Sequence, residues 1–229
     1  MTLSLSESLE SELTLFETIR VEPTGFGLER LCRWPAHFSR LGRSAAALGF
    51  PMPSESTWSD WAQALQRLPE GRLRLRLDLD RSGRLSWRHA VLTELPAASV
   101  GVGLAAAPLP IEQARWVGFK TSRRSVYDQA IREAEAAGLF DLLFFNEHDE
   151  LTEGARSNVL VQLDGHWFTP PQSSGLLPGV MRATLLADPG LALRERVIRR
   201  SDLPKVQAWQ VCNALRGLVP ATMAGLNRG

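Results

Sequence analysis

Cysteine is scarce in this chain of 229 residues, where Cys32 and Cys212 are the only two. They lie far apart and outside any C-x-x-C or Cys/His spacing, so the sequence predicts neither a disulfide framework nor a zinc site. A reducing compartment is therefore favoured, and we expect a cytoplasmic protein. No apolar run approaches the roughly 20 residues of a membrane span. The acidic, serine-containing start at 1–15 does not have the pattern of a signal peptide.

An excess of charge of either sign is also missing. The 26 basic and 25 acidic residues leave a formal net charge of +1. This balance argues against a broad electrostatic surface for nucleic acid or an anionic membrane, and we expect neither as a partner. With 44% hydrophobic and 22% charged residues, the composition is that of an ordinary globular protein. The length suits one large or two small domains, and the sequence points to a protein that acts on small molecules.

Lysine is rare as well, because only Lys120 and Lys205 are lysines among the 26 basic residues. Amine chemistry therefore has two side-chain candidates besides the N-terminus. Lys120 lies in G-F-K-T-S-R-R-S, where the neighbouring Arg123 and Arg124 favour the neutral, nucleophilic form of an amine. Taken alone, an exposed lysine at a helix start is the simpler interpretation. Lys205 is expected at the surface.

The first half of the chain predicts a small α/β arrangement. Residues 15–21 have a strand pattern, and 37–48 and 56–68 have helical spacing. Residues 72–79 (R-L-R-L-R-L-D-L) alternate with period two and form a hairpin with 85–92, with leucine on one face and charge on the other. A solvated sheet face and a face that lines a cleft fit this pattern equally well.

The second half also mixes helices and strands, without a regular βαβ repeat. Helices are expected over 125–137 and 180–187, and strands over 141–145, 158–163, 166–169, 193–198 and 209–213. The small, proline-bearing segment 105–111 has no periodicity and is the best candidate for a linker. The fold class is therefore α/β of the α+β type, with a small N-terminal domain (1–104), the linker, and a larger C-terminal domain (112–229).

Two segments of the second half have the composition of a binding site. In S-S-G-L-L-P-G-V-M-R, Gly175, Pro178 and Gly179 come directly before a predicted helix. Unpaired N–H groups and the positive end of the helix dipole make such a turn suitable for a phosphate. In L-T-E-G-A-R-S-N, Glu153 lies on a loop entering a strand. A surface acid is the simple interpretation, but a carboxylate is also what keeps a pyridine nitrogen protonated.

The lysine, the acidic loop and the phosphate turn, in this order and spacing, resemble the fold-type IV pyridoxal-phosphate enzymes. That family includes branched-chain and D-amino-acid aminotransferases and aminodeoxychorismate lyase. Each motif is weak by itself, but the ordered set is specific and covers about residues 15–221. The motifs are F-E-T-I-R, H-x-x-R-L (37–41), the Lys120 segment, T-E-G-x-x-S-N (152–158), T-P-P (169–171), L-L-P-G-V-M-R and N-A-L-R-G-L.

The resemblance implies roles for individual residues. Lys120 would hold pyridoxal phosphate covalently through its amine, and Arg40 would bind the cofactor phosphate with its guanidinium. Glu153 would pair with the protonated ring nitrogen, which sustains the electron sink. Val180 and Met181 would add backbone N–H groups to the phosphate site.

Three further residues receive less specific roles from the same resemblance. Asn213 falls where relatives place a hydroxyl or amide beside the phosphate. Tyr127 is either a residue that faces the cofactor ring or a half-buried helix residue, and both interpretations stay open. Arg76 lies in a strand that resembles R-L-x-L-x-x-x-G of the lyase domain, which makes it the candidate for a substrate carboxylate. Relatives usually carry another strand before F-E-T-I-R, so we expect a small domain trimmed on its substrate side.

Two segments resemble the lyase branch of the family: C-N-A-L-R-G-L-V-P-A (212–221) and K-T-x-x-R-x-x-Y (120–127). This implies conversion of 4-amino-4-deoxychorismate to 4-aminobenzoate and pyruvate, a step toward folate. The alternative is an aminotransferase on the same scaffold, acting on branched-chain or D-amino acids. A second alternative is a non-catalytic dimeric module that retains the fold. Family resemblance also implies a homodimer.

Overall fold

The computed structural model describes residues 13–95, 99–110 and 116–225. Their contacts divide the chain into two units. The small unit consists of 1–94 together with 119–123, and the large unit of 95–118 together with 124–229. The small unit is therefore discontinuous, because the short segment around Lys120 returns to it. Residues 1–12, which make up most of the segment without a signal-peptide pattern, lie outside the described residues.

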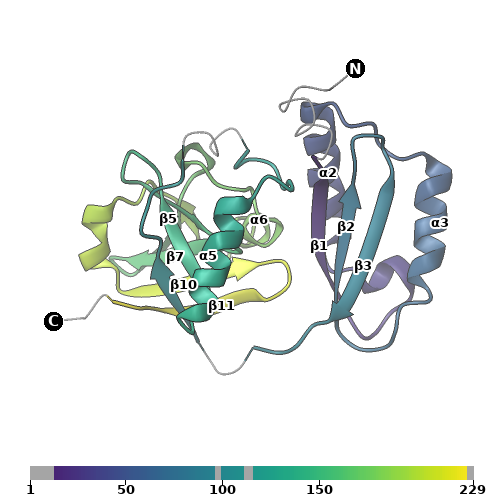
Figure 1. Ribbon diagram of the computed structural model, residues 1–229. Helices are drawn as coiled ribbons and strands as arrows, with labels where there is room; N and C mark the ends of the chain where they lie inside the picture. The colour runs from purple at the N-terminus through teal and green to yellow at the C-terminus, as the bar shows by residue number, and fades with distance from the viewer. Residues whose placement is uncertain (1–12, 96–98, 111–115, 226–229) are drawn as a thin grey trace, which may run out of the picture. The chain divides into compact units, whose positions relative to one another are not determined.

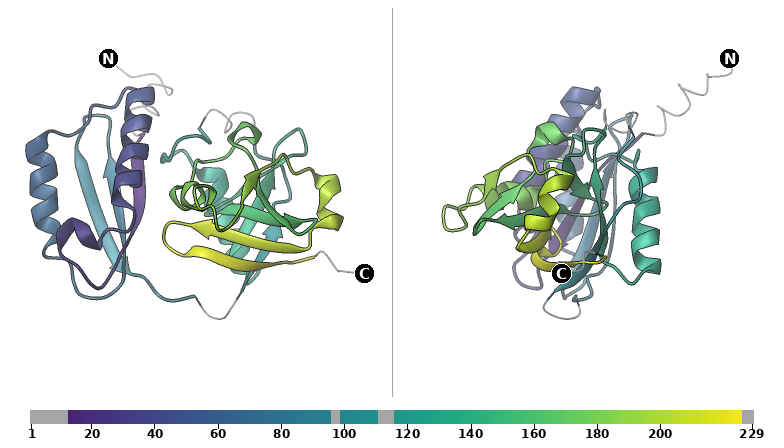
Figure 2. Two further views of the ribbon diagram at one scale, coloured as in Figure 1. Left: turned by 180° about the vertical axis from the view of Figure 1, so that it is seen from behind. Right: turned by 90° about the vertical axis from the view of Figure 1, so that its left-hand side faces the viewer.

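The small unit contains a three-stranded antiparallel sheet in the order β1-β2-β3 (Figure 1). Its elements are β1 (Leu15–Val21), η1 (Gly27–Arg30), α2 (Trp34–Leu48), α3 (Glu55–Leu65), β2 (Leu73–Leu79) and β3 (Leu85–Val91). The four leucines of β2 are all buried, as the period-two pattern predicts. Seen from behind in Figure 2, α2 lies over one face of this sheet.

Local signals fix the helix ends. Pro35 in the first turn suits the start of α2, and Gly49 ends the helix in the left-handed region at φ 68°. Ser54 caps α3 by accepting a hydrogen bond from the Thr57 N–H at 3.2 Å. The observed helices agree with the predicted ones, although α2 begins three residues before His37 and α3 ends at Leu65.

The large unit is built on an eight-stranded sheet in the order β6-β5-β4-β11-β10-β7-β8-β9. Its strands are β4 (Val100–Leu104), β5 (Asp141–Phe145), β6 (Leu151–Gly154), β7 (Asn158–Leu163), β8 (His166–Thr169), β9 (Arg194–Glu195), β10 (Ala208–Asn213) and β11 (Gly217–Met223). Its helices are α5 (Ser125–Ala136), η2 (Gln172–Ser174), α6 (Val180–Leu186) and η3 (Arg200–Lys205). The sheet is curled. Between β6 and β7, the Gly154 N–H donates a hydrogen bond to the Ser157 carbonyl at 2.7 Å.

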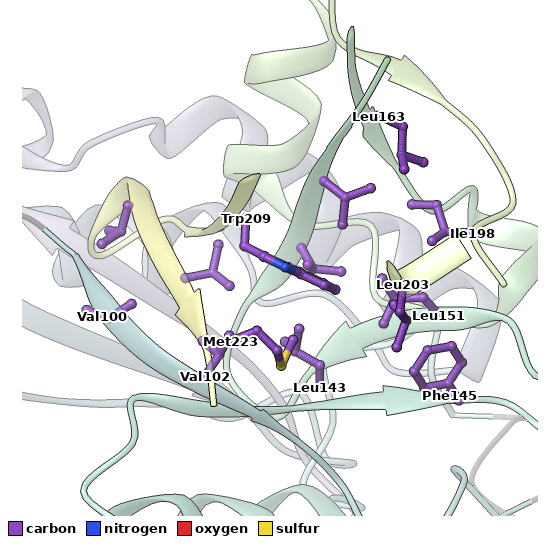
Figure 3. Packing of buried hydrophobic residues seen from close by; sticks show 14 residues of the cluster. Val100, Val102, Leu143, Phe145, Leu151, Leu163, Ile198, Leu203, Trp209 and Met223 are labelled. Carbon is purple, nitrogen blue, oxygen red and sulfur yellow. The ribbon is translucent and has the colours of Figure 1, made fainter. Parts of the chain in front are cut away.

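One hydrophobic cluster fills the concave side of this sheet. It joins residues from β4, β5, β6, β7, β10 and β11 with Ile198 and Leu203. Figure 3 shows the ring of Trp209 in the middle of the cluster, with Leu143 and Met223 nearby. A second cluster, around Ala134, lies between α5 and β5. In the described part of the chain no helix is long and apolar enough to cross a bilayer.

The predicted domain boundary needs correction. Val100–Leu104, assigned to the N-terminal domain, form β4 and pair in parallel with β5 and β11 of the large unit. The predicted linker 105–111 is not a free connection either. The N–H groups of Ala105 and Leu109 donate to the carbonyls of Leu143 and Phe145 at 2.8 and 2.9 Å. Residue 111 lies outside the described residues. The segment after β4 thus stays hydrogen-bonded to β5 at two points, which its small residues without periodicity do not distinguish from a free linker.

Candidate functional site

Backbone hydrogen bonds fix Lys120 beside β1 in the small unit. The Phe16 N–H donates to the Lys120 carbonyl at 2.9 Å, and the Ser122 N–H donates to the Thr14 carbonyl at 2.9 Å. The side chain of Lys120 is half-buried, with its Nζ atom 4.6 Å from the centroid of the Phe16 ring. A cation at this distance from an aromatic face is attracted to it. Both the backbone and the amine of Lys120 are therefore positioned by β1.

The same ring also holds Arg76. The guanidinium carbon of Arg76 lies 3.8 Å from the Phe16 centroid, and Arg76 Nη2 pairs with Asp78 at 2.7 Å. Phe16 thus contacts both the predicted cofactor lysine and the predicted substrate arginine. These two residues, 44 positions apart in the sequence, lie on the same side of the small unit's sheet.

A cavity of about 180 Å³ opens on this sheet face. Thr18, Arg76 and Arg88 lie opposite one another on β1, β2 and β3. The lining residues are Thr18, Arg74, Arg76, Arg88, His89 and Ala90. Arg76 and Arg88 both pair with Asp78, and Arg74 adds a third guanidinium to the lining. The cavity has an excess of positive charge, which suits an anion with more than one acidic group.

Arg40 projects from α2 into a buried cluster with Glu17 and His37. Its Nε and Nη2 atoms donate to the two carboxylate oxygens of Glu17 at 2.8 and 2.6 Å. His37 Nδ1 lies 2.7 Å from the same carboxylate. All three side chains are buried. Arg40, predicted to bind phosphate, is therefore held in one orientation by the glutamate of F-E-T-I-R.

The charges of this cluster follow from its contacts. Burial acts to raise the pKa of Glu17, but the charge and hydrogen bonds of Arg40, with those of His37, outweigh it and lower the pKa to about 2. Burial lowers the pKa of His37 despite the neighbouring carboxylate. At neutral pH, Glu17 is thus ionised and the neutral imidazole donates its Nδ1–H to it.

In the large unit, Glu153 lies in β6 rather than on the expected loop, and its side chain is buried. The Tyr127 hydroxyl donates to Glu153 Oε1 at 2.9 Å, and Asn158 Nδ2 donates to Oε2 at 3.4 Å. Burial and then the negative charge of Glu153 raise the pKa of Tyr127, so the phenol stays protonated and remains a donor. Of the two interpretations of Tyr127, the structure shows a buried helix residue that contacts the predicted cofactor carboxylate.

Asn158 connects this carboxylate to the predicted phosphate turn. Its Nδ2 also donates to the Leu177 carbonyl at 3.0 Å. A Cβ atom on Gly179 would lie 1.9 Å from Asn158 Oδ1, so only glycine fits at this position. Gly179 precedes α6, whose first residues are Val180 and Met181. The N–H groups of a first helical turn have no acceptor within the helix.

Asp141 stabilises the segment that follows Glu153. It is fully buried and accepts hydrogen bonds from Ser157 Oγ at 2.5 Å and from the Arg156 N–H at 3.2 Å. A Cβ on Gly154 would lie 2.2 Å from its Oδ2 atom, so the glycine after Glu153 makes room for this carboxylate. Burial raises the pKa of Asp141 to about 6 although these donors lower it. The turn of T-E-G-x-x-S-N is thus built around a second acid.

Asn213 lies at the end of β10, where its amide stabilises the turn to β11. Its Oδ1 atom accepts from the N–H groups of Leu215 and Arg216 at 3.1 and 2.9 Å, and its Nδ2 donates to the Arg156 carbonyl at 3.1 Å. The role beside a phosphate stays a prediction.

Each unit therefore brings part of the predicted site together. In the small unit, Lys120 and Arg76 meet at Phe16, and Arg40 is held by Glu17. In the large unit, Glu153, Tyr127 and the turn before α6 meet at Asn158. Lys205 is exposed, as predicted. In the described residues no group of three or more His, Cys, Asp or Glu side chains is arranged for a metal.

Sequence reasoning missed four residues of these clusters: Glu17, Arg74, Arg88 and Asn158. Glu17 and Asn158 belong to quoted motifs, but no role was given to them. Arg74 follows from the period-two pattern of β2, which places it on the same face as Arg76. Arg88 had no comparable signal, because its place depends on the register of β3 against β2.

Comparison with known proteins gives three informative relatives. The family model described as "Amino-transferase class IV" matches residues 14–223. A Schizosaccharomyces pombe protein named "Putative aminodeoxychorismate lyase" is 27% identical over 194 residues, or 83% of this chain and 80% of that protein. A Mesorhizobium loti crystal structure titled "Putative amino-acid aminotransferase" is 34% identical, with a TM-score of 0.81 over 93% of this chain and 100% of its own. A Legionella pneumophila structure titled "Putative 4-amino-4-deoxychorismate lyase" is 22% identical, with a TM-score of 0.77 over 99% and 89% of the two chains.

Proposed function

Since this chain belongs to the class IV aminotransferase family, we propose that it is the lyase of that family that converts 4-amino-4-deoxychorismate to 4-aminobenzoate and pyruvate. The match over residues 14–223 confirms the resemblance found in the sequence, and the structural relatives confirm the mixed α/β fold class. The names of the relatives divide between lyase and aminotransferase. The choice between these reactions therefore depends on this chain's own residues.

The cofactor of the family is pyridoxal phosphate, as the sequence predicts, and the residues present fit it. The chain offers a half-buried lysine for an aldehyde, a buried arginine for a phosphate, and a buried carboxylate with two neutral donors for a ring nitrogen. Only glycine fits at position 179 beside Asn158, so no side chain covers the backbone directly before α6, where the phosphate is expected. When bound, pyridoxal phosphate supplies an electron sink for the bonds at the amine-bearing carbon of the substrate.

The residues around this cofactor would have distinct tasks. Lys120 would anchor the cofactor through its amine until the amine of the substrate displaces it. The freed Lys120 amine would then take the proton from the amine-bearing carbon and later donate one to the leaving enol, which becomes pyruvate. Glu153 would pair with the ring nitrogen and keep it protonated, with Tyr127 and Asn158 fixing the orientation of its carboxylate. In the small unit, Arg40 would bind the phosphate with its guanidinium. In the large unit, the N–H groups of Val180 and Met181 are the proposed phosphate donors. Asn213 is proposed to lie beside that phosphate.

The arginine-lined cavity is the observation that carries the choice of the lyase. The proposed substrate has two carboxylates, one on its ring and one on the enolpyruvyl group. Arg74, Arg76 and Arg88 supply three cations against one carboxylate, and Arg76 shares the Phe16 ring with Lys120. A branched-chain amino acid has one carboxylate and an apolar side chain. Of the cavity's lining, only Ala90 would suit an apolar side chain.

An aminotransferase is the second candidate, because the Mesorhizobium loti structure is 34% identical to this chain. An aminotransferase needs a 2-oxo acid to accept the amino group, whereas the lyase reaction needs no acceptor. Product formation with and without an added 2-oxo acid therefore separates the two reactions. We further propose that the protein is a cytoplasmic homodimer, which light scattering of the purified protein tests for the oligomeric state.

The decisive assay combines the purified protein, pyridoxal phosphate and enzymatically generated 4-amino-4-deoxychorismate, and follows 4-aminobenzoate. Wild type should form product without a 2-oxo acid, and Lys120→Ala should lose more than about 1,000-fold in rate, because general acid–base catalysis alone contributes on the order of 100- to 10,000-fold. Lys205→Ala is the matched control and should retain full activity. A Lys120→Ala variant of near-normal activity would refute the assignment of the lysine.

A variant of the cavity tests the choice of substrate. Arg88→Gln should raise KM for the dicarboxylate about tenfold, the effect of losing one charge-assisted hydrogen bond, while kcat changes little. Arg84→Gln is the control, because Arg84 lies on the same hairpin, is exposed and does not line the cavity. An unchanged KM in Arg88→Gln, or a yellow protein that forms no 4-aminobenzoate but transfers the amino group of an amino acid to a 2-oxo acid, would favour the aminotransferase.

A further inference from the structure

The small unit has a second cavity whose lining differs completely from that of the arginine cavity. It has a volume of about 310 Å³ and lies among η1, α2 and α3. Its lining residues are Leu28, Trp34, Phe38, Glu55, Trp58 and Trp61. None of these residues has a role in the proposed reaction, so the cavity needs an explanation of its own.

Four aromatic rings form its wall. Trp34 is central, with its ring centroid 4.8 Å from that of Trp61, 5.5 Å from Phe38 and 5.9 Å from Trp58. Trp58 meets Phe38 and Trp61 nearly edge-on, at interplanar angles of 78° and 79°. Tilted and edge-on packing holds each ring in a defined orientation, and a wall of such rings presents π faces as well as ring edges.

The wall is only partly covered by protein. Trp61 is 4% exposed and anchors the cluster in the core, whereas Phe38 and Leu28 are each 40% exposed. Large apolar side chains that remain exposed around a concavity are typical of a binding site rather than of a folding core. The volume of the cavity is at the lower end of the range of small-molecule pockets.

The charge of the lining selects the ligand. Among the described lining residues, Glu55 is the one that carries a charge, and it is negative. It begins α3 and lies three residues before Trp58, on the same face of the helix. Aromatic faces attract cations and repel anions, and a carboxylate adds to this preference. We therefore infer that this cavity binds a small organic cation with an apolar surface, of the quaternary ammonium class.

Choline is a suitable probe, because 3,3-dimethylbutan-1-ol has nearly the same shape without the charge. Binding to the cofactor-loaded protein is followed by tryptophan fluorescence and by saturation-transfer NMR of the methyl protons. Choline should bind saturably and at least about fivefold more tightly than the alcohol, as a cation–π contribution of about 1 kcal/mol requires. Equal binding of the two probes, or no saturable binding of choline, would overturn the inference.

Two variants locate the effect. Glu55→Gln should weaken choline several-fold and leave the alcohol unchanged, whereas Asp60→Asn, an equal change of charge at an exposed position of α3 outside the lining, should alter neither. Trp58→Leu keeps an apolar wall but removes one π face, and should weaken choline selectively. Circular dichroism verifies that each variant is folded. If Asp60→Asn weakened choline as much as Glu55→Gln, the effect would be that of net charge, and the cavity would lose its assignment.

Discussion

Each unit of this protein buries a carboxylate near the predicted site, but the two units stabilise it in different ways. In the small unit, Glu17 is 1% exposed and contacts the guanidinium of Arg40 and the ring of His37. In the large unit, Asp141 is 0% exposed and accepts hydrogen bonds from a serine hydroxyl and from backbone N–H groups. The guanidinium of Arg156 pairs with Glu135 instead, at 2.9 Å.

This difference gives the two acids opposite titration behaviour. Burial raises the pKa of both groups, but for Glu17 the charge of Arg40 outweighs burial and the pKa falls to about 2. For Asp141 the donors do not compensate for burial, and the pKa rises to about 6. A cationic partner in direct contact therefore decides whether the pKa of a buried acid falls below or rises above its ordinary value.

The largest expected effect is that of Glu17→Gln. The variant leaves the guanidinium of Arg40 buried without its counter-charge, so we expect a loss of about 3–5 kcal/mol in the free energy of unfolding. Urea denaturation at pH 7 measures it. Affinity for pyridoxal phosphate should fall as well, because Glu17 orients the proposed phosphate ligand.

Glu22→Gln is the matched control. Glu22 directly follows β1, the strand that contains Glu17; it is about one-third exposed and pairs with Arg20 at 2.7 Å. An exposed pair of this kind contributes less than about 1 kcal/mol. If both variants lost the same stability, the buried cluster would have no special role.

The next effect is the dependence of stability on pH. The pKa of Asp141 is raised in the folded state from 3.8 to about 6. Its ionisation therefore opposes folding. At about 1.4 kcal/mol per unit of pKa shift, the full effect is about 3 kcal/mol, of which about 2 kcal/mol should appear as the pH falls from 7 to 4. Urea midpoints measured across this range check the rise. Asp141→Asn should flatten it, and a profile that is unchanged in the variant would contradict this assignment.

Glu17 has the opposite sign over a lower range. Its folded pKa is depressed from 4.5 to about 2, so the stability that its charge contributes is complete above pH 4.5 and is lost as the pH falls toward 2. The loss is also on the order of 3 kcal/mol. Glu17→Gln should remove this acid limb without changing the slope between pH 5 and 6, which belongs to Asp141. A steep acid limb that persists in the variant would assign it to other carboxylates.

The smallest effect concerns Glu153, which also accepts hydrogen bonds from neutral donors. Tyr127→Phe removes the hydroxyl that donates to Glu153 Oε1 at 2.9 Å and keeps the ring. Loss of one such donor should cost about 1 kcal/mol in the free energy of unfolding and reduce turnover by a few-fold. Thermal unfolding and the 4-aminobenzoate assay measure the two effects. A loss as large as that of Glu17→Gln would mean that the large unit depends on this contact as the small unit depends on its ion pair.

The sequence by itself determined the elements with strong local patterns. The alternation over 72–79 located β2 and its buried face, and helical spacing with Gly49 located α2. The order of short motifs was sufficient for the family and its cofactor, because each motif carries its chemistry within a few neighbouring residues. These features are local, since caps, periodicity and turn residues act over one or two turns of chain.

The tertiary structure decided the rest. The positions at which the chain passes from one unit to the other differ from the predicted boundary. β4 pairs with β5 and β11 of the large unit, and residues 119–123 return to β1 of the small unit. The tertiary structure also determines which side chains meet. Glu17 contacts Arg40, Asn158 contacts Glu153, and Arg88 lines the same cavity as Arg76. Such pairings join residues that are far apart in sequence. A pattern in one segment reports how that segment is buried, and only the register of strands and the packing of helices specify which side chain it meets.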